Sequence, residues 1–374
     1  MSSDRDPVII AARRTPIGTR GRALARFRVE ELSAPVILAA IADAEAATGA
    51  SVTIADVLLG NCMGPGGNPA RLAALAAGLG THVPGGTVDR QCGSGLAAVL
   101  DAVAAIRAGD ERMRVAGGAE SASTAPVRSL HGIPYDRAPF APAGFSDPDM
   151  TRAAEDLAAH DGLSRSRQDA HAARSHARAR SALAAGRFDA ELVSMGGLDH
   201  DDAIGGAERL LDRLPVLFPG GTLTAGTSTR IGDGAAALIV APAGAAPGLA
   251  VRASAVVGCD PALPGIGAAP AVQAAVRSAG VDLADVAAFE IVEAFAAQSL
   301  AVLDRLWLNE DDERVSADGG ALALGHPWGA SGAVAVVRLF SRLVRGGAPA
   351  GTLGVAAASI GGGMGIAAVL EVVR

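Results

Sequence analysis

The chain has 374 residues, of which 50% are hydrophobic and 19% charged, and its formal net charge is −7. This composition excludes a disordered chain, and no apolar run reaches the roughly 18 residues that a membrane span needs. An acidic chain whose basic residues are all Arg, without a basic block, argues against nucleic acid as a partner. Three cysteines are too few for a disulfide framework, and the start lacks the pattern of a signal peptide, so we expect a cytoplasmic protein.

Apolar runs and Ala-rich helical segments alternate along the first 120 residues. The sequence predicts strands over 8–12, 57–60 and 114–118, and helices over 33–47 and 96–107. Strands and helices in this order predict an α/β protein with a mostly parallel sheet that is covered on both faces.

Residues 121–230 differ in texture from the chain on either side. Residues 126–150 are dense in Pro and Gly and predict an extended loop, whereas 164–186 carry Arg, His and Ala at helical spacing and predict a solvated helix. We interpret this region as a loop domain inserted into the first half of the chain, where it could cover a site.

A weak internal repeat links the two ends of the chain. Residues 91–109 form a small-residue turn and an apolar helix before the strand at 114–118, and residues 327–347 repeat this form before an expected strand at 353–359. Residues 251–258 could form the first strand of a second half, as residues 8–12 form the first strand of the first half. The pattern predicts a duplicated α/β unit, with chance similarity between Ala-rich helices as the alternative.

Three places could carry chemistry. Cys92 precedes an apolar helix, where the N–H groups and the dipole would stabilise a thiolate nucleophile; the alternative is an inert buried thiol. His326 lies in a turn before a second helix and could act as a base or an oxyanion donor, or be structural. The run SIGGGMG at 359–365 could aim backbone N–H groups at an anion, or form a plain tight turn.

Taken together, four sequence blocks resemble the signature blocks of the thiolase family, in the same order. They are VDRQCGSGLAAV (88–99), EIVEAFA (290–296), GGALALGHPWGASG (319–332) and SIGGGMG, and the similarity extends over nearly the whole chain. It is strongest to biosynthetic-type acetyl-CoA acetyltransferases. The resemblance implies an α/β thiolase fold with two similar βαβ-type halves in a five-layered core. We expect the first half over 1–120 with 231–258, the inserted loop domain over 121–230 and the second half over 259–374.

The resemblance also implies a mechanism and its residues. Cys92 would take the acyl group of a coenzyme A thioester, and His326 would activate it. Backbone N–H groups of Cys92 and Gly361 would form one oxyanion hole. No metal or bound cofactor is expected, and the protein would be a homodimer or homotetramer. Met150, Thr229, Arg213 and Arg230 would help to bind the substrate, which an acyl carrier protein could present in place of coenzyme A.

Two departures from the family pattern affect the chemistry. Val292 stands where the family has the Asn of an Asn-Glu-Ala-Phe block. In the family that Asn holds a water, which forms a second oxyanion hole with the residue matched by His326, and Val292 cannot hydrogen-bond this water. Ser359 stands where the family has a second catalytic Cys, and a hydroxyl is a poor base for an α-proton because it does not ionise near neutral pH. Ser359 could instead orient a water, and Glu293 could orient that water or form a structural hydrogen bond.

Three functions follow from these residues. The first is an acyl-CoA C-acyltransferase, which makes or breaks a carbon–carbon bond by Claisen condensation or thiolysis. The second is a single-cysteine acyltransferase or thioesterase without carbon–carbon chemistry, and the third is a non-catalytic partner subunit. We place the first ahead because the resemblance is so extensive. Acyl chain length and the direction of reaction stay open, and the stretch Arg128 to Phe145 could line an acyl pocket or an oligomer contact.

Overall fold

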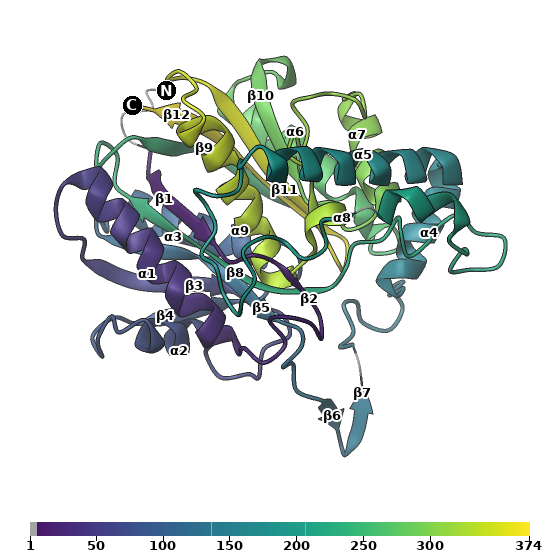
Figure 1. The fold of residues 1–374 in the computed structure, drawn as a ribbon, viewed down its shortest axis with the longest axis horizontal. Helices are drawn as coiled ribbons and strands as arrows, with labels where there is room; N and C mark the ends of the chain where they lie inside the picture. Colours follow the sequence, from purple (N-terminus) through teal and green to yellow (C-terminus); the bar gives the residue numbers. More distant parts are fainter. Residues whose placement is uncertain (1–5, 136, 206) are drawn as a thin grey trace.

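The computed structural model describes residues 6–135, 137–205 and 207–374. Its main feature is a mixed sheet of ten strands, in the order β10-β11-β12-β9-β1-β8-β5-β3-β4, with β2 paired to β8 (Figure 1). The strands are β1 (Val8–Arg14), β2 (Gly18–Thr19), β3 (Ile54–Gly60), β4 (Gly85–Val88), β5 (Met113–Ser121), β8 (Gly232–Ala241), β9 (Gly248–Gly258), β10 (Val286–Ile291), β11 (Leu353–Ile360) and β12 (Met364–Val373).

The sheet contains the same four-strand pattern twice. In the first copy β3 runs parallel to β5, and β8 is antiparallel to both β5 and β1. In the second copy β10 runs parallel to β11, and β12 is antiparallel to both β11 and β9. The copies meet where β1 pairs with β9 over two residue pairs. The predicted duplication is therefore confirmed.

The prediction of a mostly parallel sheet is wrong. Parallel pairing is confined to β3 with β4 and β5, and to β10 with β11, while the other described pairs in the large sheet are antiparallel. One reason is a short connection between strands. Strands β11 and β12 are joined by three residues, Gly361 to Gly363, and so short a link can join only antiparallel strands.

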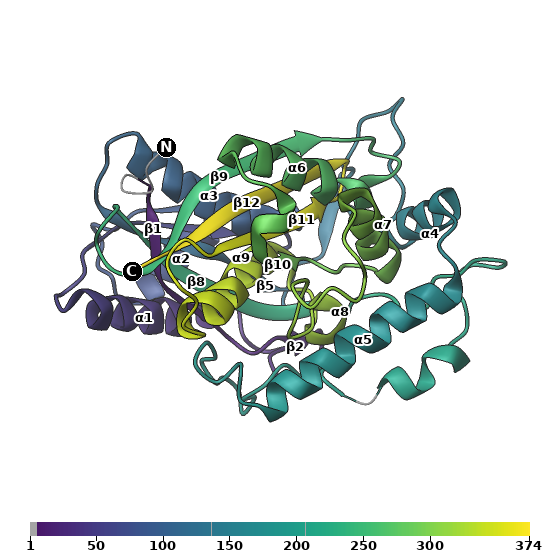
Figure 2. The same ribbon diagram turned by 90° about the horizontal axis from the view of Figure 1, so that it is seen from above.

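Helices and sheet halves alternate in five layers. Helices α3 (Ser94–Arg107) and α9 (Trp328–Leu339) pack on each other in the centre, α3 against β5 and α9 against β5 and β11. Helices α1 (Val29–Thr48) and α2 (Pro69–Ala76) cover the outer face of the first half, and α6 (Ala268–Ala279) covers that of the second, with α7 (Ala296–Leu306) beside it (Figure 2). Each outer layer buries its own apolar cluster, separate from the central one.

The middle of the chain forms two long helices and a hairpin beside this core. Helices α4 (Met150–Asp161) and α5 (Arg165–Ala184) pack on the second half, and a two-stranded hairpin, β6 (Arg128–Leu130) with β7 (Ile133–Tyr135), projects from the body (Figure 1). The expected extended loop thus contains this hairpin. Helix α5 differs from a solvated helix because one face is buried, including His171, Ser175 and His176.

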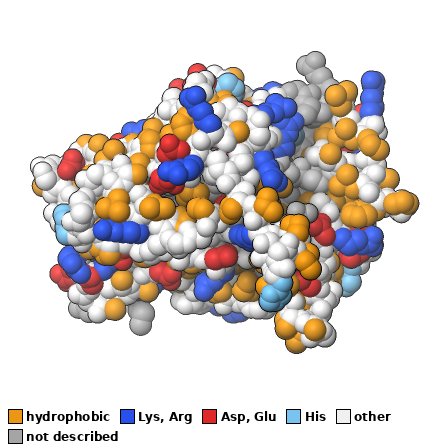
Figure 3. All heavy atoms as spheres, turned by 90° about the horizontal axis from the view of Figure 1, so that it is seen from below, with side chains coloured by type: hydrophobic (Ala, Val, Ile, Leu, Met, Phe, Trp, Pro, Cys, Tyr) orange, Lys and Arg blue, Asp and Glu red, His pale blue; other side chains and the backbone are white. Residues whose placement is uncertain are grey.

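The projecting hairpin exposes apolar side chains. Val127 is 85% exposed and Ile133 72% exposed. In Figure 3, which views the face from which the hairpin projects, apolar side chains lie among basic ones over a broad area. The division into a first half, an inserted loop domain and a second half stays a prediction.

A buried ion cluster ties residues 187–202 to the core. Arg14 donates to Glu191 Oε1 at 2.7 Å and to Asp201 Oδ1 at 2.6 Å, and all three side chains are fully buried. Arg338, on α9, pairs with Glu191 and with Asp318. The charges compensate one another inside the protein, where an unpaired ion would cost several kcal/mol.

Candidate active site

Cys92 lies in a tight turn that leads into α3. The residue before it, Gln91, has a left-handed backbone with φ of 45°, a conformation that a non-glycine residue adopts at a cost. Ser94 holds the turn, because its hydroxyl donates to the Gln91 carbonyl at 2.6 Å and accepts from Arg90 N–H at 2.8 Å. The sulfur is thereby fixed at the start of the helix.

Burial decides the ionisation of Cys92. It raises the pKa of the thiol to about 11, and the backbone N–H groups of Cys92 and Gly361 lower the pKa only in part. The negative charges of Glu120 and Asp89 raise the pKa further. The expectation of a stabilised thiolate is therefore wrong for the free protein, which holds a neutral thiol at pH 7. The two N–H groups instead suit a negative oxygen that forms next to the sulfur.

Three glycines bring the Cys92 turn and the His326 turn together. A Cβ on Gly60 would lie 2.4 Å from Gly95 N and 2.5 Å from Gly329 O, and one on Gly95 would lie 2.9 Å from Gly329 O. Gly95 and Gly329 each follow their functional residue by three positions. Larger side chains would force the first turns of α3 and α9 apart, and the two turns with them.

His326 is held in one tautomer by a single hydroxyl. Its Nδ1 lies 2.6 Å from Ser331 Oγ, and that hydroxyl donates its proton to the Pro327 carbonyl at 3.0 Å. We assign the hydroxyl proton to the Pro327 carbonyl, so that the hydroxyl accepts from Nδ1–H and the lone pair lies on Nε2. Nε2 is buried and has no hydrogen-bond partner within the described residues. Burial lowers the pKa of His326 to about 4, so the ring is a neutral acceptor at pH 7.

The low pKa of His326 predicts a specific loss of stability in acid. Its pKa is about 6.5 in the unfolded chain, so stability from the neutral ring is present above pH 6.5 and lost as the pH falls toward 4. Between pH 7 and pH 4.5 the wild type should lose about 2 kcal/mol more free energy of unfolding than His326→Asn. Urea unfolding at the two pH values measures this. Exposed His82→Asn is the control and should match the wild type, whereas equal losses in all three proteins would contradict the prediction.

Gly361 lies in the hairpin turn between β11 and β12. Gly362 and Gly363, which follow it, have φ of 86° and 83°, so the turn needs glycine at those positions. The turn packs beside the nucleophile, since Gly361 N–H is a partner of the Cys92 sulfur. Met150 also comes to this place: its Sδ would lie 3.4 Å from a Cβ on Gly361.

Ser359 is engaged in the backbone of a neighbouring segment. Its hydroxyl donates to the Gly265 carbonyl at 2.6 Å and accepts from Ala268 N–H at 3.0 Å. Ala268 is the first residue of α6, and the hydroxyl therefore satisfies one of the free N–H groups of that helix. The proton and one acceptor lone pair of the hydroxyl are thus engaged by backbone groups, and one lone pair remains.

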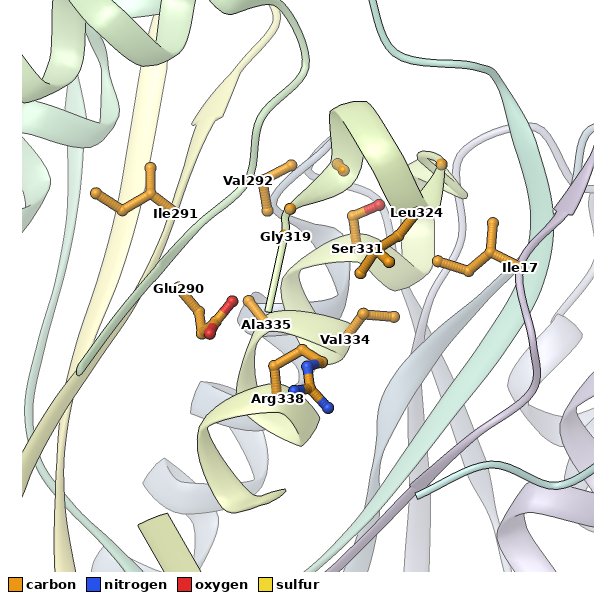
Figure 4. A pocket seen from close by; sticks show the side chains of 13 residues that line it. Ile17, Glu290, Ile291, Val292, Gly319, Leu324, Ser331, Val334, Ala335 and Arg338 are labelled. Atoms are coloured by element: carbon orange, nitrogen blue, oxygen red, sulfur yellow. The ribbon is translucent and has the colours of Figure 1, made fainter. Parts of the chain in front are cut away.

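Val292 lines a small internal cavity of about 30 Å³, which is room for about one water molecule. Figure 4 shows its side chain on the same side of the cavity as Ser331 and Leu324, with Glu290 and Arg338 at the other end. An isopropyl group offers no hydrogen bond to a water there, so a water would have to bind at the polar end.

Glu293 joins helix α5 to the segment before His326. One carboxylate oxygen accepts from Ser175 Oγ at 2.7 Å, and the other lies 3.5 Å from His171 Nε2. Ser175 in turn accepts from Gly320 N–H at 3.1 Å, at the start of α8 (Ala321–Leu324). Burial opposes the charge of Glu293, yet these partners hold its pKa below the usual value. The carboxylate therefore positions the loop that leads to His326, which is the structural alternative weighed above.

A larger cavity of about 500 Å³ lies next to the site. Thr229 is in its wall and donates to the Ala321 carbonyl at 2.6 Å, so its hydroxyl links this wall to α8. The remaining lining residues are mostly apolar or small, with one cation: Thr151, His176, Leu210, Leu211, Leu214, Leu217, Ala225, Gly226, Ser228, Arg230 and Leu322. Its size and lining suit a long, mostly uncharged ligand such as a pantetheine arm.

The two arginines predicted to bind substrate, Arg213 and Arg230, lie in different places relative to the larger cavity. Arg230 is exposed and lies in the wall of the larger cavity. Arg213 is exposed at the end of a 3₁₀ segment, Ala207–Arg213, outside the cavity lining. Within the described residues neither forms an ion pair. Asp149 caps α4 by accepting from Thr151 N–H at 2.9 Å.

Sequence reasoning missed Glu120, which ties the two halves of the site together. It is fully buried at the end of β5 and accepts from Asn61 Nδ2, from the backbone N–H groups of Cys62 and Met63, and from Gly329 N–H, all at 3.0–3.1 Å. Cys62 Sγ contacts the Gln91 carbonyl at 3.2 Å, and Gly329 lies three residues after His326. The sequence signal that could have identified it is a single Glu near the end of an otherwise mostly apolar strand.

The described residues contain neither a metal-binding cluster nor a membrane-spanning helix. Among residues 6–135, 137–205 and 207–374, no cluster of three or more His, Cys, Asp or Glu side chains is arranged to hold a metal ion. The same stretches contain no helix with the length and apolar character that crossing a bilayer would require.

Comparison with known proteins gives matches over the full length. Residues 7–244 match the family model "Thiolase, N-terminal domain" and residues 246–372 match "Thiolase, C-terminal domain". The chain is 41% identical over 376 residues to the putative acetyl-CoA C-acetyltransferase YhfS of Bacillus subtilis, which covers 98% of this chain and 99% of that protein. It is 39% identical over 388 residues to the 3-ketoacyl-CoA thiolase of Erwinia tasmaniensis, covering 97% and 98%.

Solved structures agree with the sequence matches. The acetyl-CoA acetyltransferase of Bacillus anthracis superposes with a TM-score of 0.87 at 34% identity and covers 99% of both chains. The human mitochondrial 3-ketoacyl-CoA thiolase superposes with a TM-score of 0.88 at 30% identity and covers both chains completely. The predicted fold class is confirmed by these neighbours.

Proposed function

The chain belongs to the thiolase family, and from this premise we propose that it is an acyl-CoA C-acyltransferase that carries the acyl group on Cys92. Relatives over the full length are named acetyl-CoA C-acetyltransferase or 3-ketoacyl-CoA thiolase. The observation that supports the covalent step best is that Gly60, Gly95 and Gly329 bring the Cys92 turn against the His326 turn, with the backbone N–H groups of Cys92 and Gly361 favouring negative charge at the nucleophile.

Acylation follows from the protonation states of the two residues. As the Cys92 sulfur attacks the thioester carbon, its proton moves to Nε2 of His326, and the carbonyl oxygen becomes negative between the two N–H groups. The carbon–sulfur bond to coenzyme A then breaks, and the departing thiolate takes the proton back from His326. The acyl group remains on Cys92 as a thioester, and coenzyme A leaves as a thiol. Proton transfer accompanies attack, because the free protein holds neither thiolate nor imidazolium.

Carbon–carbon bond formation needs a base for the α-proton of the second substrate. Ser359 is a poor choice because its hydroxyl does not ionise near neutral pH and is held by the backbone of Gly265 and Ala268. His326 is a neutral base again once coenzyme A has left, and it is our candidate for this step. The carbanion then attacks acyl-Cys92, the thioester bond to the protein breaks, and the departing Cys92 thiolate takes the proton from His326; thiolysis is the reverse.

The same observation on Ser359 favours a second candidate function. A single-cysteine acyltransferase would pass the acyl group from Cys92 to an oxygen, nitrogen or sulfur acceptor, or to water. That reaction abstracts no α-proton, so neither Ser359 nor Val292 limits it. The non-catalytic alternative is weaker because it gives no reason for the selected tautomer of His326.

The proposal also assigns a binding site to the carrier of the acyl group and a contact surface to the oligomer. The larger cavity would take the pantetheine arm, and Arg230 at its wall would meet a phosphate of coenzyme A or of an acyl carrier protein. The exposed apolar side chains around the projecting hairpin would contact another copy of the chain in a homodimer or homotetramer. We place the protein in the cytoplasm, with no metal or bound cofactor.

Intact-protein mass spectrometry tests the covalent step. Wild type mixed with acetyl-CoA or acetoacetyl-CoA should gain one acetyl group, and Cys92→Ala should gain none; Cys259→Ala, a matched cysteine variant, should behave as wild type. Four-carbon product from acetyl-CoA would favour the C-acyltransferase, and slow release of acetate the second candidate. Absence of an adduct with coenzyme A esters and with acyl carrier protein would overturn the proposal.

A further inference from the structure

A short basic loop, residues 20–26, follows strand β2. It contains three arginines, Arg20, Arg22 and Arg26, and neither Asp nor Glu. All three side chains are exposed, and none of them forms an ion pair within the part of the chain that the structure describes. Exposed arginines elsewhere do pair with a nearby carboxylate, as on helix α4. The basic loop therefore presents positive charge that the protein itself leaves unpaired.

The basic loop runs beside the wall of the larger cavity. The backbone N–H of Arg20 donates to the Ile231 carbonyl at 2.9 Å, and Ile231 directly follows the exposed Arg230, which lies in that wall. Gly21 N–H donates to Ser123 Oγ at 2.7 Å, and its φ of 79° suits glycine at this turn. The loop is thus attached to the body of the protein directly beside Arg230.

The mouth of the cavity adds apolar surface to this charge. Leu210 and Leu217 line the cavity, yet 52% and 44% of their surfaces are exposed. An apolar patch with charged residues around it is typical of a surface that binds another protein. The cavity lining contains one arginine, Arg230, which matches the single phosphodiester of a phosphopantetheine arm, whereas coenzyme A carries several phosphates.

We infer that the basic loop docks an acidic carrier protein, which presents a thioester to Cys92 on a phosphopantetheine arm inserted through the larger cavity. This inference rests on the proposed function and names a carrier for it. The acylation step is the one described for coenzyme A, with the thiol of the arm as the leaving group.

Charge favours this partner and this orientation. The chain has a net charge of −7, so long-range repulsion opposes an acidic partner over most of the surface, and unpaired arginines offer it a local attraction. Docking at the basic loop would bring the arm to the cavity. Nucleic acid fits less well, because three arginines fall short of the runs of about five or six like charges that mark nucleic-acid-binding arms.

The test compares acetyl-CoA, acetyl-pantetheine and an acidic acyl carrier protein of bacterial fatty-acid synthesis loaded with an acetyl group. The second-order rate of Cys92 acylation is measured by intact mass for wild type and for the triple variant R20A/R22A/R26A. Wild type should react with the carrier-protein ester at least about tenfold faster than with acetyl-pantetheine, and about 0.5 M salt should abolish this advantage. The triple variant should lose about tenfold or more with the carrier-protein ester alone.

Two controls accompany the triple variant. R20K/R22K/R26K keeps the charge and should behave as wild type, since docking by long-range attraction does not need the guanidinium shape. Arg277→Ala removes an exposed arginine from α6, far along the chain from the basic loop, and should also behave as wild type. The salt dependence of wild type tests the inference even if the alanine variant fails to fold.

The other outcomes are distinguishable. An equal loss with acetyl-CoA would make the basic loop a site for nucleotide phosphates and overturn docking of a carrier protein. A carrier-protein ester that reacts no faster than acetyl-pantetheine, or an alanine variant that reacts as wild type does, would also overturn it, while an adduct from acetyl-CoA would uphold the proposed function. Absence of an adduct from all three esters would overturn the proposed function itself.

Discussion

His326→Asn should lower the rate of Cys92 acylation by acetyl-CoA about 10³-fold at pH 7. The reason is the pKa of Cys92, about 11, which leaves only about one thiolate in 10⁴ molecules at that pH. In the proposed mechanism wild type avoids this limit because Nε2 of His326 accepts the proton during attack. The asparagine amide keeps a donor for Ser331 but has no acceptor in the place of Nε2.

The pH dependence gives this prediction its sharpest form. The neutral thiol and imidazole that react in wild type predominate between the two pKa values, about 4 and about 11, so wild-type acylation should be nearly flat from pH 6 to pH 10. His326→Asn depends on thiolate and should gain about tenfold per pH unit over the same range. Quenched-flow intact mass spectrometry measures both profiles, with His160→Asn as control. Parallel profiles in wild type and His326→Asn would refute a base role for His326.

Introducing the two missing family residues should increase carbon–carbon chemistry about 10²-fold or more. Ser359→Cys supplies a thiol at the position of the second family Cys, and Val292→Asn supplies an amide that can hold a water beside the small cavity. The combined variant should form four-carbon product from acetyl-CoA much faster than wild type, while acylation of Cys92 stays within a few-fold.

Ser359→Ala is the matched control for that experiment. It removes the hydrogen bonds to Gly265 and Ala268 and should cost about 1 kcal/mol of unfolding free energy, with acylation and condensation both unchanged. Product appearance is followed by chromatography, and stability by urea unfolding. If wild type already condenses as fast as it is acylated, or if Ser359→Ala stops condensation, Ser359 takes part in the chemistry and our assignment is wrong.

The sequence predicted the elements of the core well, because their signals are local. The strand over Val8–Arg14, the helix over Ser94–Arg107 and the repeat of that helix near the C-terminus all rest on apolar periodicity and small-residue turns. Strand direction was missed because it depends on which segments return as hairpins. The three-residue link at Gly361 is visible in the sequence, and its consequence for the sheet was overlooked.

The site was predicted in part for a related reason. Blocks of sequence placed Cys92, His326 and Gly361 in turns, and the structure brings the Cys92 turn together with the other two. Ionisation could not be predicted in the same way, because the burial that raises the pKa of Cys92 comes from segments far apart in the chain. Positioning groups such as Glu120 were missed for the same reason: a buried carboxylate is recognised by its partners, and these lie on two segments far apart in the chain, 61–63 and Gly329.

The buried ion cluster limits how this architecture could have been assembled and how it can be re-engineered. Glu191 and Asp201 come from the inserted region, whereas their partners Arg14 and Arg338 come from opposite ends of the chain. Excising the segment predicted as inserted would leave the Arg14 guanidinium without a carboxylate partner and Arg338 with Asp318 alone, and grafting a foreign segment would require matching carboxylates at the same points. The insertion is therefore not an exchangeable module, and a chimaera that swaps it must carry these acidic residues along.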